Sequence, residues 1–196
     1  LSRGLGDVYK RQLQQSSELG LSKSSKLLGD WYIKKIIPGD NYKEAFKLYT
    51  RGYEFGDMRS FSRLAMCYEK GYGIKKDIPK ALELYEKSVE LGNKDACFSI
   101  ARIYEKGENI KMDLSKAILW YKRGYEKGDA DCACNLATCY YKGKGIEQNI
   151  EKAKEIFLAF SEYNTQNQRN LGVIFYKGTP SCKPNEEEAI YWLSLI

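Results

Sequence analysis

The chain has 196 residues and a formal net charge of +6, with 43% hydrophobic and 30% charged residues. This composition is typical of a globular protein rather than a disordered one, and no segment approaches the roughly 20 consecutive apolar residues of a membrane-spanning helix. The absence of histidine excludes Ser-His-Asp and Cys-His catalysis and every His-ligated metal site.

The two ends of the chain differ in character from the rest. The segment Asp7-Val8-Tyr9-Lys10-Arg11-Gln12 resembles one reading frame of the transposase end sequence used in sequencing libraries, and the terminal Leu-Ser-Leu-Ile resembles its opposite strand. We interpret residues 1–12 and 193–196 as sequencing or cloning scars. Residues 13–192 are then the folded array, and we expect the natural protein to be longer on both sides.

A period of 36 residues runs through the chain. Alanine marks it at Ala45, Ala81, Ala117, Ala153 and Ala189, and a large aliphatic residue at Leu28, Leu64, Ile100, Leu136 and Leu171. A fixed period of roughly 20–50 residues indicates a stacked-repeat architecture. We divide the array into repeats 25–60, 61–96, 97–132, 133–167 and a truncated 168–192.

The second repeat shows the structure expected of each unit. From Phe61 to Tyr68 the apolar residues follow helical spacing, and Gly71 then suits a helix end in the left-handed conformation. Asp77 suits the N-cap of a second helix, with Pro79 in its first turn. The equivalent capping residues elsewhere are Asp40, Asp113 and Asn149.

These patterns predict a helix-turn-helix hairpin of about 11 and 14 residues in each repeat. Alanine or glycine is expected where the two helices approach closely, at Gly29, Ala65, Ala101, Ala137 and Gly172. A hairpin of this size cannot bury its own apolar face, so each must stack on its neighbours. The predicted fold class is all-α, an α/α superhelical solenoid of helix-turn-helix repeats.

The repeat is similar to the Sel1-like repeat family, relatives of the tetratricopeptide repeats. The likeness covers roughly residues 25–192 and is carried by the stretch 64–74, by Asp77, Lys80-Ala81, Asp113, Lys116-Ala117, Trp120-Tyr121 and Lys152-Ala153. The resemblance implies right-handed superhelices that act as adaptors between other proteins, with the first helix of each repeat lining the concave face. A secreted, cysteine-rich branch of the family ties each hairpin by a disulfide, but its second-helix cysteines are here Ser88 and Gly124.

Positions just beyond the apolar stripe of each first helix are expected to face that concave groove and contact the partner. They are Lys34, Met66, Glu69, Lys70, Arg102, Glu105, Lys106, Thr138, Tyr141, Lys142, Tyr176 and Lys177. Lysine recurs in all five repeats, and such a ladder could clamp an acidic peptide or a C-terminal carboxylate. Alternatively, each lysine only ends a helix and interacts with its dipole. Tyr141 and Tyr176 favour the C-terminal half as the interface.

The other candidate motifs indicate structure rather than chemistry. The pairs Gly71/Gly73 and Gly143/Gly145 lack the preceding strand and third glycine of a dinucleotide site, so we interpret them as turns. Cys67 and Cys139 stand where other repeats have isoleucine, which predicts free, structural thiols and a reducing, cytoplasmic compartment. No carboxylate pair is placed for acid–base catalysis.

The sequence therefore predicts a non-enzymatic scaffold or adaptor that binds another protein or peptide, with no cofactor, metal or membrane. Nucleic acid is a poor ligand because the positive charges are interleaved with acidic residues. The alternative is a regulatory repeat region of a larger enzyme or signalling protein whose catalytic domain lies outside this chain. The sequence does not predict an oligomeric state.

Overall fold

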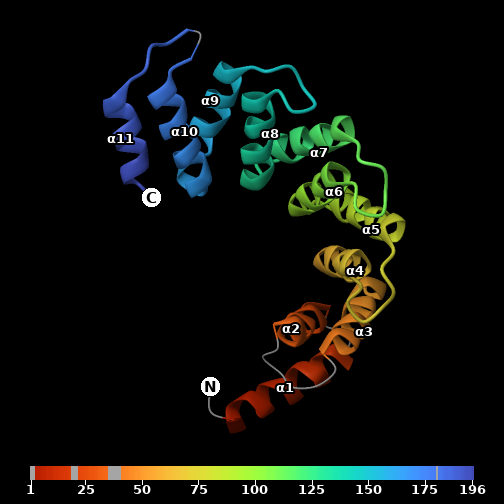
Figure 1. Cartoon of the computed structure of the whole chain (residues 1–196). Helices are drawn as coiled ribbons and strands as arrows, with labels where there is room; N and C mark the ends of the chain where they lie inside the picture. The colour runs from red at the N-terminus through yellow and green to blue at the C-terminus, as the bar shows by residue number, and fades with distance from the viewer. Residues whose placement is uncertain (1–2, 19–21, 35–40, 180) are drawn as a thin grey trace. The chain divides into compact units, whose positions relative to one another are not determined.

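The computed structural model describes residues 3–18, 22–34, 41–179 and 181–196 (Figure 1). Over these residues the chain forms α-helices and one short 3₁₀ helix, with no β-strand, which confirms the all-α prediction. The helices are α1 (Arg3–Glu18), α2 (Ser22–Ile33), α3 (Asn41–Glu54), α4 (Met58–Lys70), α5 (Ile78–Glu90), α6 (Asp95–Lys106), α7 (Leu114–Glu126), α8 (Ala130–Lys142), α9 (Ile150–Ala159), η1 (Ser161–Tyr163), α10 (Thr165–Lys177) and α11 (Glu186–Ser194).

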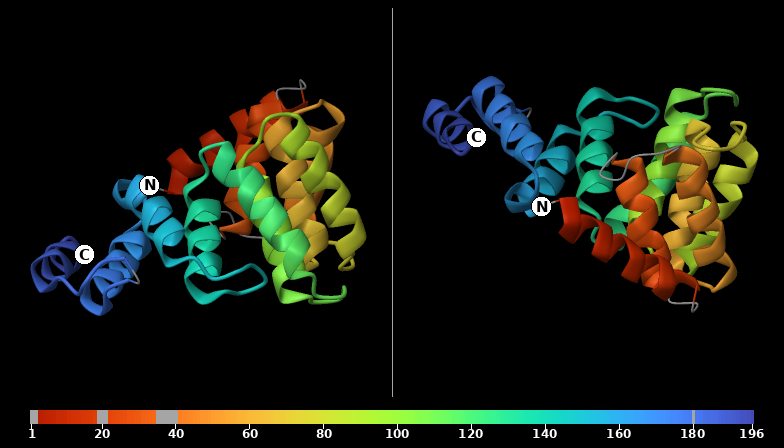
Figure 2. Two further views of the ribbon diagram at one scale, coloured as in Figure 1. Left: turned by 90° about the horizontal axis from the view of Figure 1, so that it is seen from above. Right: turned by 90° about the horizontal axis from the view of Figure 1, so that it is seen from below.

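The chain divides into two compact units, Leu1–Ala96 and Cys97–Ile196. We call α2, α4, α6, α8 and α10 the first helices of the repeats, and α3, α5, α7, α9 and α11 the second helices. In the first unit α2 packs on α3 and α4 on α5, while α1 lies against α2. In the second unit α8 packs on α9 and α10 on α11, and these pairs can be followed in Figures 1 and 2.

Four second helices begin at a side-chain cap, as the sequence predicts for Asp77, Asp113 and Asn149. Asp77 accepts a hydrogen bond from the Lys80 N–H at 3.0 Å, and Asp113 does the same from Lys116 at 2.9 Å. Asn149 and Asn185 repeat the contact with the N–H groups of Lys152 and Glu188. Each cap satisfies a donor that the helix leaves unpaired, a contribution of about 1 kcal/mol. The predicted cap Asp40 lies outside the described residues.

The first helices begin earlier than the apolar pattern suggests. In the second repeat both helices have 13 residues, whereas the sequence predicts about 11 and 14. The difference arises because Asp57 caps α4 through the Ser60 N–H at 3.0 Å, so the helix begins at Met58, three residues before the stripe begins at Phe61.

The small residues of the 36-residue period lie in the core between helices. Ala81, Ala117 and Ala153 are at most 1% exposed. At Gly29, an added Cβ would lie 2.6 Å from Cε1 of Tyr49, so only glycine lets the Tyr49 ring cross α2 there. The predicted close approach of first and second helices is therefore confirmed.

The paired glycines of the hairpin loops have two separate roles. Gly71 and Gly143 end their helices in the left-handed conformation, as predicted. Gly73 and Gly145, also at positive φ, bring each loop against the start of the preceding second helix. A Cβ on Gly145 would lie 2.7 Å from Cβ of Leu114. These glycines are turn and packing residues.

Candidate functional site

The five lysines of the predicted ladder lie at equivalent ends of the first helices. Lys70, Lys106, Lys142 and Lys177 occupy the last turns of α4, α6, α8 and α10. Lys34 follows α2, and its N–H donates to the Asp30 carbonyl at 3.0 Å. All five side chains are exposed. This position suits a favourable interaction with the helix dipole, and it also leaves the ammonium groups accessible to a partner.

Two glutamates of the predicted surface are already engaged within their own hairpins. Glu69 accepts a hydrogen bond from Oη of Tyr85, and Glu105 accepts one from Oη of Tyr121, both at 2.8 Å. Both tyrosines are buried in the second helix. We call these contacts tyrosine–carboxylate pairs; each joins the first helix of a repeat to the second.

Sequence reasoning missed these pairs, although a signal was present. In two successive repeats the carboxylate and the tyrosine are 16 residues apart. In the fourth repeat both change together, to Tyr141 and Phe157. Because Phe157 has no hydroxyl group to donate, position 141 is released from the role of acceptor.

In the first repeat, the acceptor of the tyrosine hydrogen bond is Asp30, which lies one turn before the position equivalent to Glu69. Its Oδ1 accepts from Oη of Tyr49 at 2.7 Å and pairs with Nε of Arg63 on α4 at 3.0 Å. Lys26 pairs with the other oxygen at 2.7 Å. Burial raises the pKa of Tyr49, and its hydrogen bond to Asp30 raises it further. Asp30 thus joins the first and second repeats by a charged contact.

Glu105 is shared in the same way between the third and fourth repeats. Nζ of Lys144, in the loop after α8, donates to its Oε1 at 2.7 Å. Burial acts to raise the pKa of Glu105, but the hydrogen bonds from Lys144 and Tyr121 outweigh it, so the pKa lies below its usual value. The glutamate is therefore held as a carboxylate.

The first helices of the last two repeats present a different surface. Tyr176 on α10 is 64% exposed and Val173, one turn before it, is 37% exposed. Tyr141 on α8 is half-buried at the equivalent position. Within the described part of the chain neither Lys142 nor Lys177 forms an ion pair, whereas Lys70 pairs with Glu69 at 2.5 Å and Lys106 with Glu108 at 3.7 Å.

The remaining predicted residues have local contacts. Met66 is half-buried on α4, and the Arg102 guanidinium lies 5.6 Å from the centre of the Phe98 ring on its own helix. Thr138 donates its hydroxyl to the Cys134 carbonyl at 2.8 Å. The contacts of Arg102 and Thr138 are therefore made within their own first helices.

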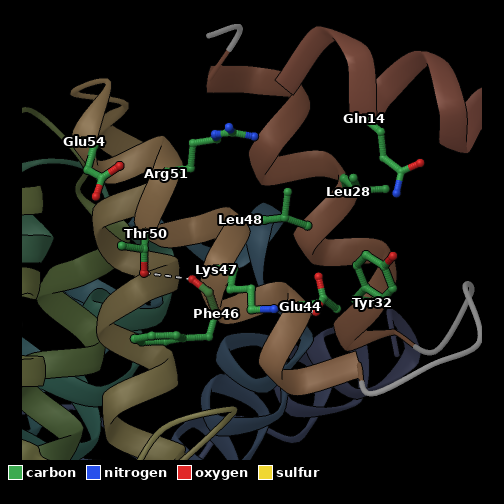
Figure 3. Close-up of a pocket in the computed structure, with 10 residues that line it drawn as sticks. All are labelled: Gln14, Leu28, Tyr32, Glu44, Phe46, Lys47, Leu48, Thr50, Arg51 and Glu54. Atoms are coloured by element: carbon green, nitrogen blue, oxygen red, sulfur yellow. Dashed lines mark hydrogen bonds and ion pairs between the residues drawn. The ribbon is translucent and has the colours of Figure 1, made fainter. Parts of the chain in front are cut away.

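A separate pocket of about 510 Å³ opens between α1, α2 and α3 (Figure 3). Its lining is Gln14, Leu28, Tyr32, Glu44, Phe46, Lys47, Leu48, Thr50, Arg51 and Glu54. Leu28 and Tyr32 are buried, and Lys47 pairs with Glu44 at 2.9 Å. No nucleophile stands beside a base among these lining residues, and none of them belongs to the predicted surface.

The thiols are structural in character. Five of the six cysteines are buried and Cys182 is exposed, and none is in a disulfide. Burial raises the pKa of Cys67 to about 12 and that of Cys134 to about 11, which disfavours the reactive thiolate. The described side chains contain no group of three or more acidic or thiol ligands placed to hold a metal ion. No described helix combines the length and apolar character needed to cross a bilayer.

Comparison with known proteins identifies the repeats. The Sel1 repeat profile matches residues 25–57, 62–93, 94–129, 130–161 and 168–195. A Sel1 repeat protein from Oxalobacter formigenes has a similar structure, with a TM-score of 0.85 and 26% identity over 95% of this chain and 76% of that one.

Two further structures share the fold. The protective antigen c5321 from uropathogenic Escherichia coli has a TM-score of 0.79 and 24% identity over 94% of this chain and 40% of its own. A Sel1 repeat protein from Klebsiella pneumoniae has a TM-score of 0.56 and 25% identity over 95% and 90%. No curated protein sequence matches the chain. The predicted α/α solenoid of helix-turn-helix repeats is confirmed.

Proposed function

Because the chain belongs to the Sel1 repeat family, we propose that it is a non-enzymatic scaffold that binds a partner protein or peptide along its first helices. Proteins of this family generally act through protein–protein interaction and serve as non-catalytic scaffolds. The twelve predicted surface residues all belong to first helices or the residue that follows one. We propose that the partner binds to the surface that carries these residues, the concave face that the sequence predicts.

The observation that carries this proposal is the repeated exposure of a lysine at the same helix end. A stacked repeat presents equivalent side chains at regular intervals along one surface, which suits recognition of an extended chain. The lysines are exposed in all five repeats, and Lys106, Lys142 and Lys177 belong to one compact unit, where a partner with carboxylate groups could contact more than one of them. Multiple weak contacts of this kind favour an acidic peptide over a compact small molecule.

A selection from a random peptide library displayed on phage, with the purified chain immobilised, tests this function. Peptides that bind are remeasured against the triple variant K70E/K106E/K142E, which reverses charge on three first helices. The matched control is K87E/K111E/K127E, which makes the same charge change at exposed lysines of second helices and loops. We expect the first variant to lose binding and the control to retain it. Equal binding by both variants would refute a first-helix site.

A further inference from the structure

We propose that the binding surface is centred on α8 and α10 and that its ligand is an acidic peptide bearing aromatic or large apolar side chains. This inference rests on the proposed function and narrows it to two repeats. Tyr141 and Lys142 on α8, and Tyr176 and Lys177 on α10, form the surface. Both helices pack against α9 within the same unit.

The first reason is the loss of the tyrosine–carboxylate pair in these repeats. In the second and third repeats, the first-helix position before the ladder lysine holds Glu69 or Glu105. A buried tyrosine of the second helix donates a hydrogen bond to each of these carboxylates. In the fourth and fifth repeats the same position holds Tyr141 or Tyr176, and an aromatic ring takes the place of the carboxylate acceptor. Each ring is available as an apolar anchor, since large aromatic residues supply much of the energy of protein interfaces.

The second reason is that the lysine next to each tyrosine in the sequence, Lys142 or Lys177, carries a positive charge that is not paired with a carboxylate of the described residues. Lys142 and Lys177 are exposed and form no ion pair with any described residue. Arg169 on α10 is exposed as well. The neighbouring Glu105 contributes little opposing charge, because Lys144 already pairs with it at 2.7 Å. The surface therefore offers positive charge to carboxylates of a ligand.

The third reason is the exposed apolar area on α10. Val173 and Tyr176 are one turn apart, so their side chains lie on one face of the helix. A ring or aliphatic side chain of the ligand can pack on this stripe while an adjacent carboxylate reaches Lys177. Both α8 and α10 pack on α9, and an extended peptide, at about 3.3 Å per residue, can bring side chains several positions apart to the two helices.

A fluorescein-labelled peptide that repeats the triplet Glu-Glu-Phe is the probe, measured by fluorescence polarisation against the full chain. We expect binding that weakens about tenfold or more in K142E/K177E, and similarly in Y176A. Since Tyr176 is mostly exposed, Y176A should keep its fold, which circular dichroism checks. The matched control is K87E/K127E, which reverses two exposed lysines outside the first helices and should leave the affinity unchanged. The variant K70E/K106E, on α4 and α6, should weaken binding less than K142E/K177E.

The peptide is varied too, with Gln in place of Glu and with Ala in place of Phe, and each change should abolish measurable binding. The inference is overturned if the probe does not bind, if K142E/K177E binds it normally, or if K70E/K106E weakens it equally. If the Glu-Glu-Phe probe does not bind but phage-selected peptides bind through the first-helix lysines, this inference is refuted and the proposed scaffold function stands. If neither the probe nor any selected peptide binds through these lysines, both the inference and the first-helix binding site are refuted.

Discussion

Glu105 illustrates how a single side chain can serve two repeats at once. One oxygen accepts from Tyr121 within the hairpin and the other from Lys144 in the next hairpin, at 2.8 and 2.7 Å. The side chain is still partly exposed, so solvent screens the ion pair and limits its energy. The hydrogen bond from a buried hydroxyl to a charged acceptor is the stronger component.

We expect E105Q to lower the free energy of unfolding by about 1 kcal/mol at pH 7. The folded pKa of Glu105 lies below its unfolded value of about 4.3, so its contribution is fully present above that pH. It is lost as the pH falls through the folded pKa. Urea unfolding of wild type and E105Q between pH 7 and pH 3 should therefore show the difference shrinking with acid. The control E147Q, at an exposed residue of the same loop as Lys144, should show no such convergence. A gap that stays constant down to pH 3 would contradict the assigned role.

At the scale of the element, the hairpin loop fixes how one repeat meets the next. The first glycine of each pair ends the helix, whereas the second lets the loop backbone touch the preceding repeat. At Gly145 both requirements for glycine coincide, since its φ is +70° and Cβ of Leu114 lies in the way. A residue with a side chain would suffer backbone strain and a steric clash together.

We predict that G145A destabilises the chain by at least about 2 kcal/mol, against about 1 kcal/mol for G128A. Gly128 has a similar φ of +74°, but an added Cβ there would meet nothing within 4 Å. The variant G128A therefore measures the cost of the backbone conformation alone. Chemical denaturation of both variants measures the difference. Equal costs at the two glycines would show that the loop contact contributes nothing.

Elements set by neighbouring residues were predictable from the sequence, and contacts between elements were not. The start of α5 at Asp77 and the end of α4 at Gly71 depend on capping chemistry within a few residues, so the sequence carries them directly. The pairing of Glu69 with Tyr85 spans two helices, and it depends on which faces meet across the hairpin. Periodicity placed Glu69 beyond the apolar stripe and hence toward a partner, without showing that a tyrosine of the second helix reaches it.

At the scale of the whole molecule, each repeat depends on its immediate neighbours. Leu171 is fully buried on α10, which packs against both α9 and α11. In an array of this kind stability is approximately a sum of repeat and nearest-neighbour terms, so damage in one repeat weakens those beside it most. A compact globular core would instead lose stability everywhere together.

The variant L171A distinguishes these two behaviours. Removing the buried side chain should cost about 2–5 kcal/mol locally, and amide hydrogen exchange should accelerate strongly in α9, α10 and α11. Exchange in α4 and α5, which belong to the other unit, should change little. The matched control V173A alters an exposed residue of the same helix and should leave the exchange pattern as in wild type. A uniform acceleration in every helix would contradict nearest-neighbour stability, because it would mean that one cooperative transition governs the whole chain.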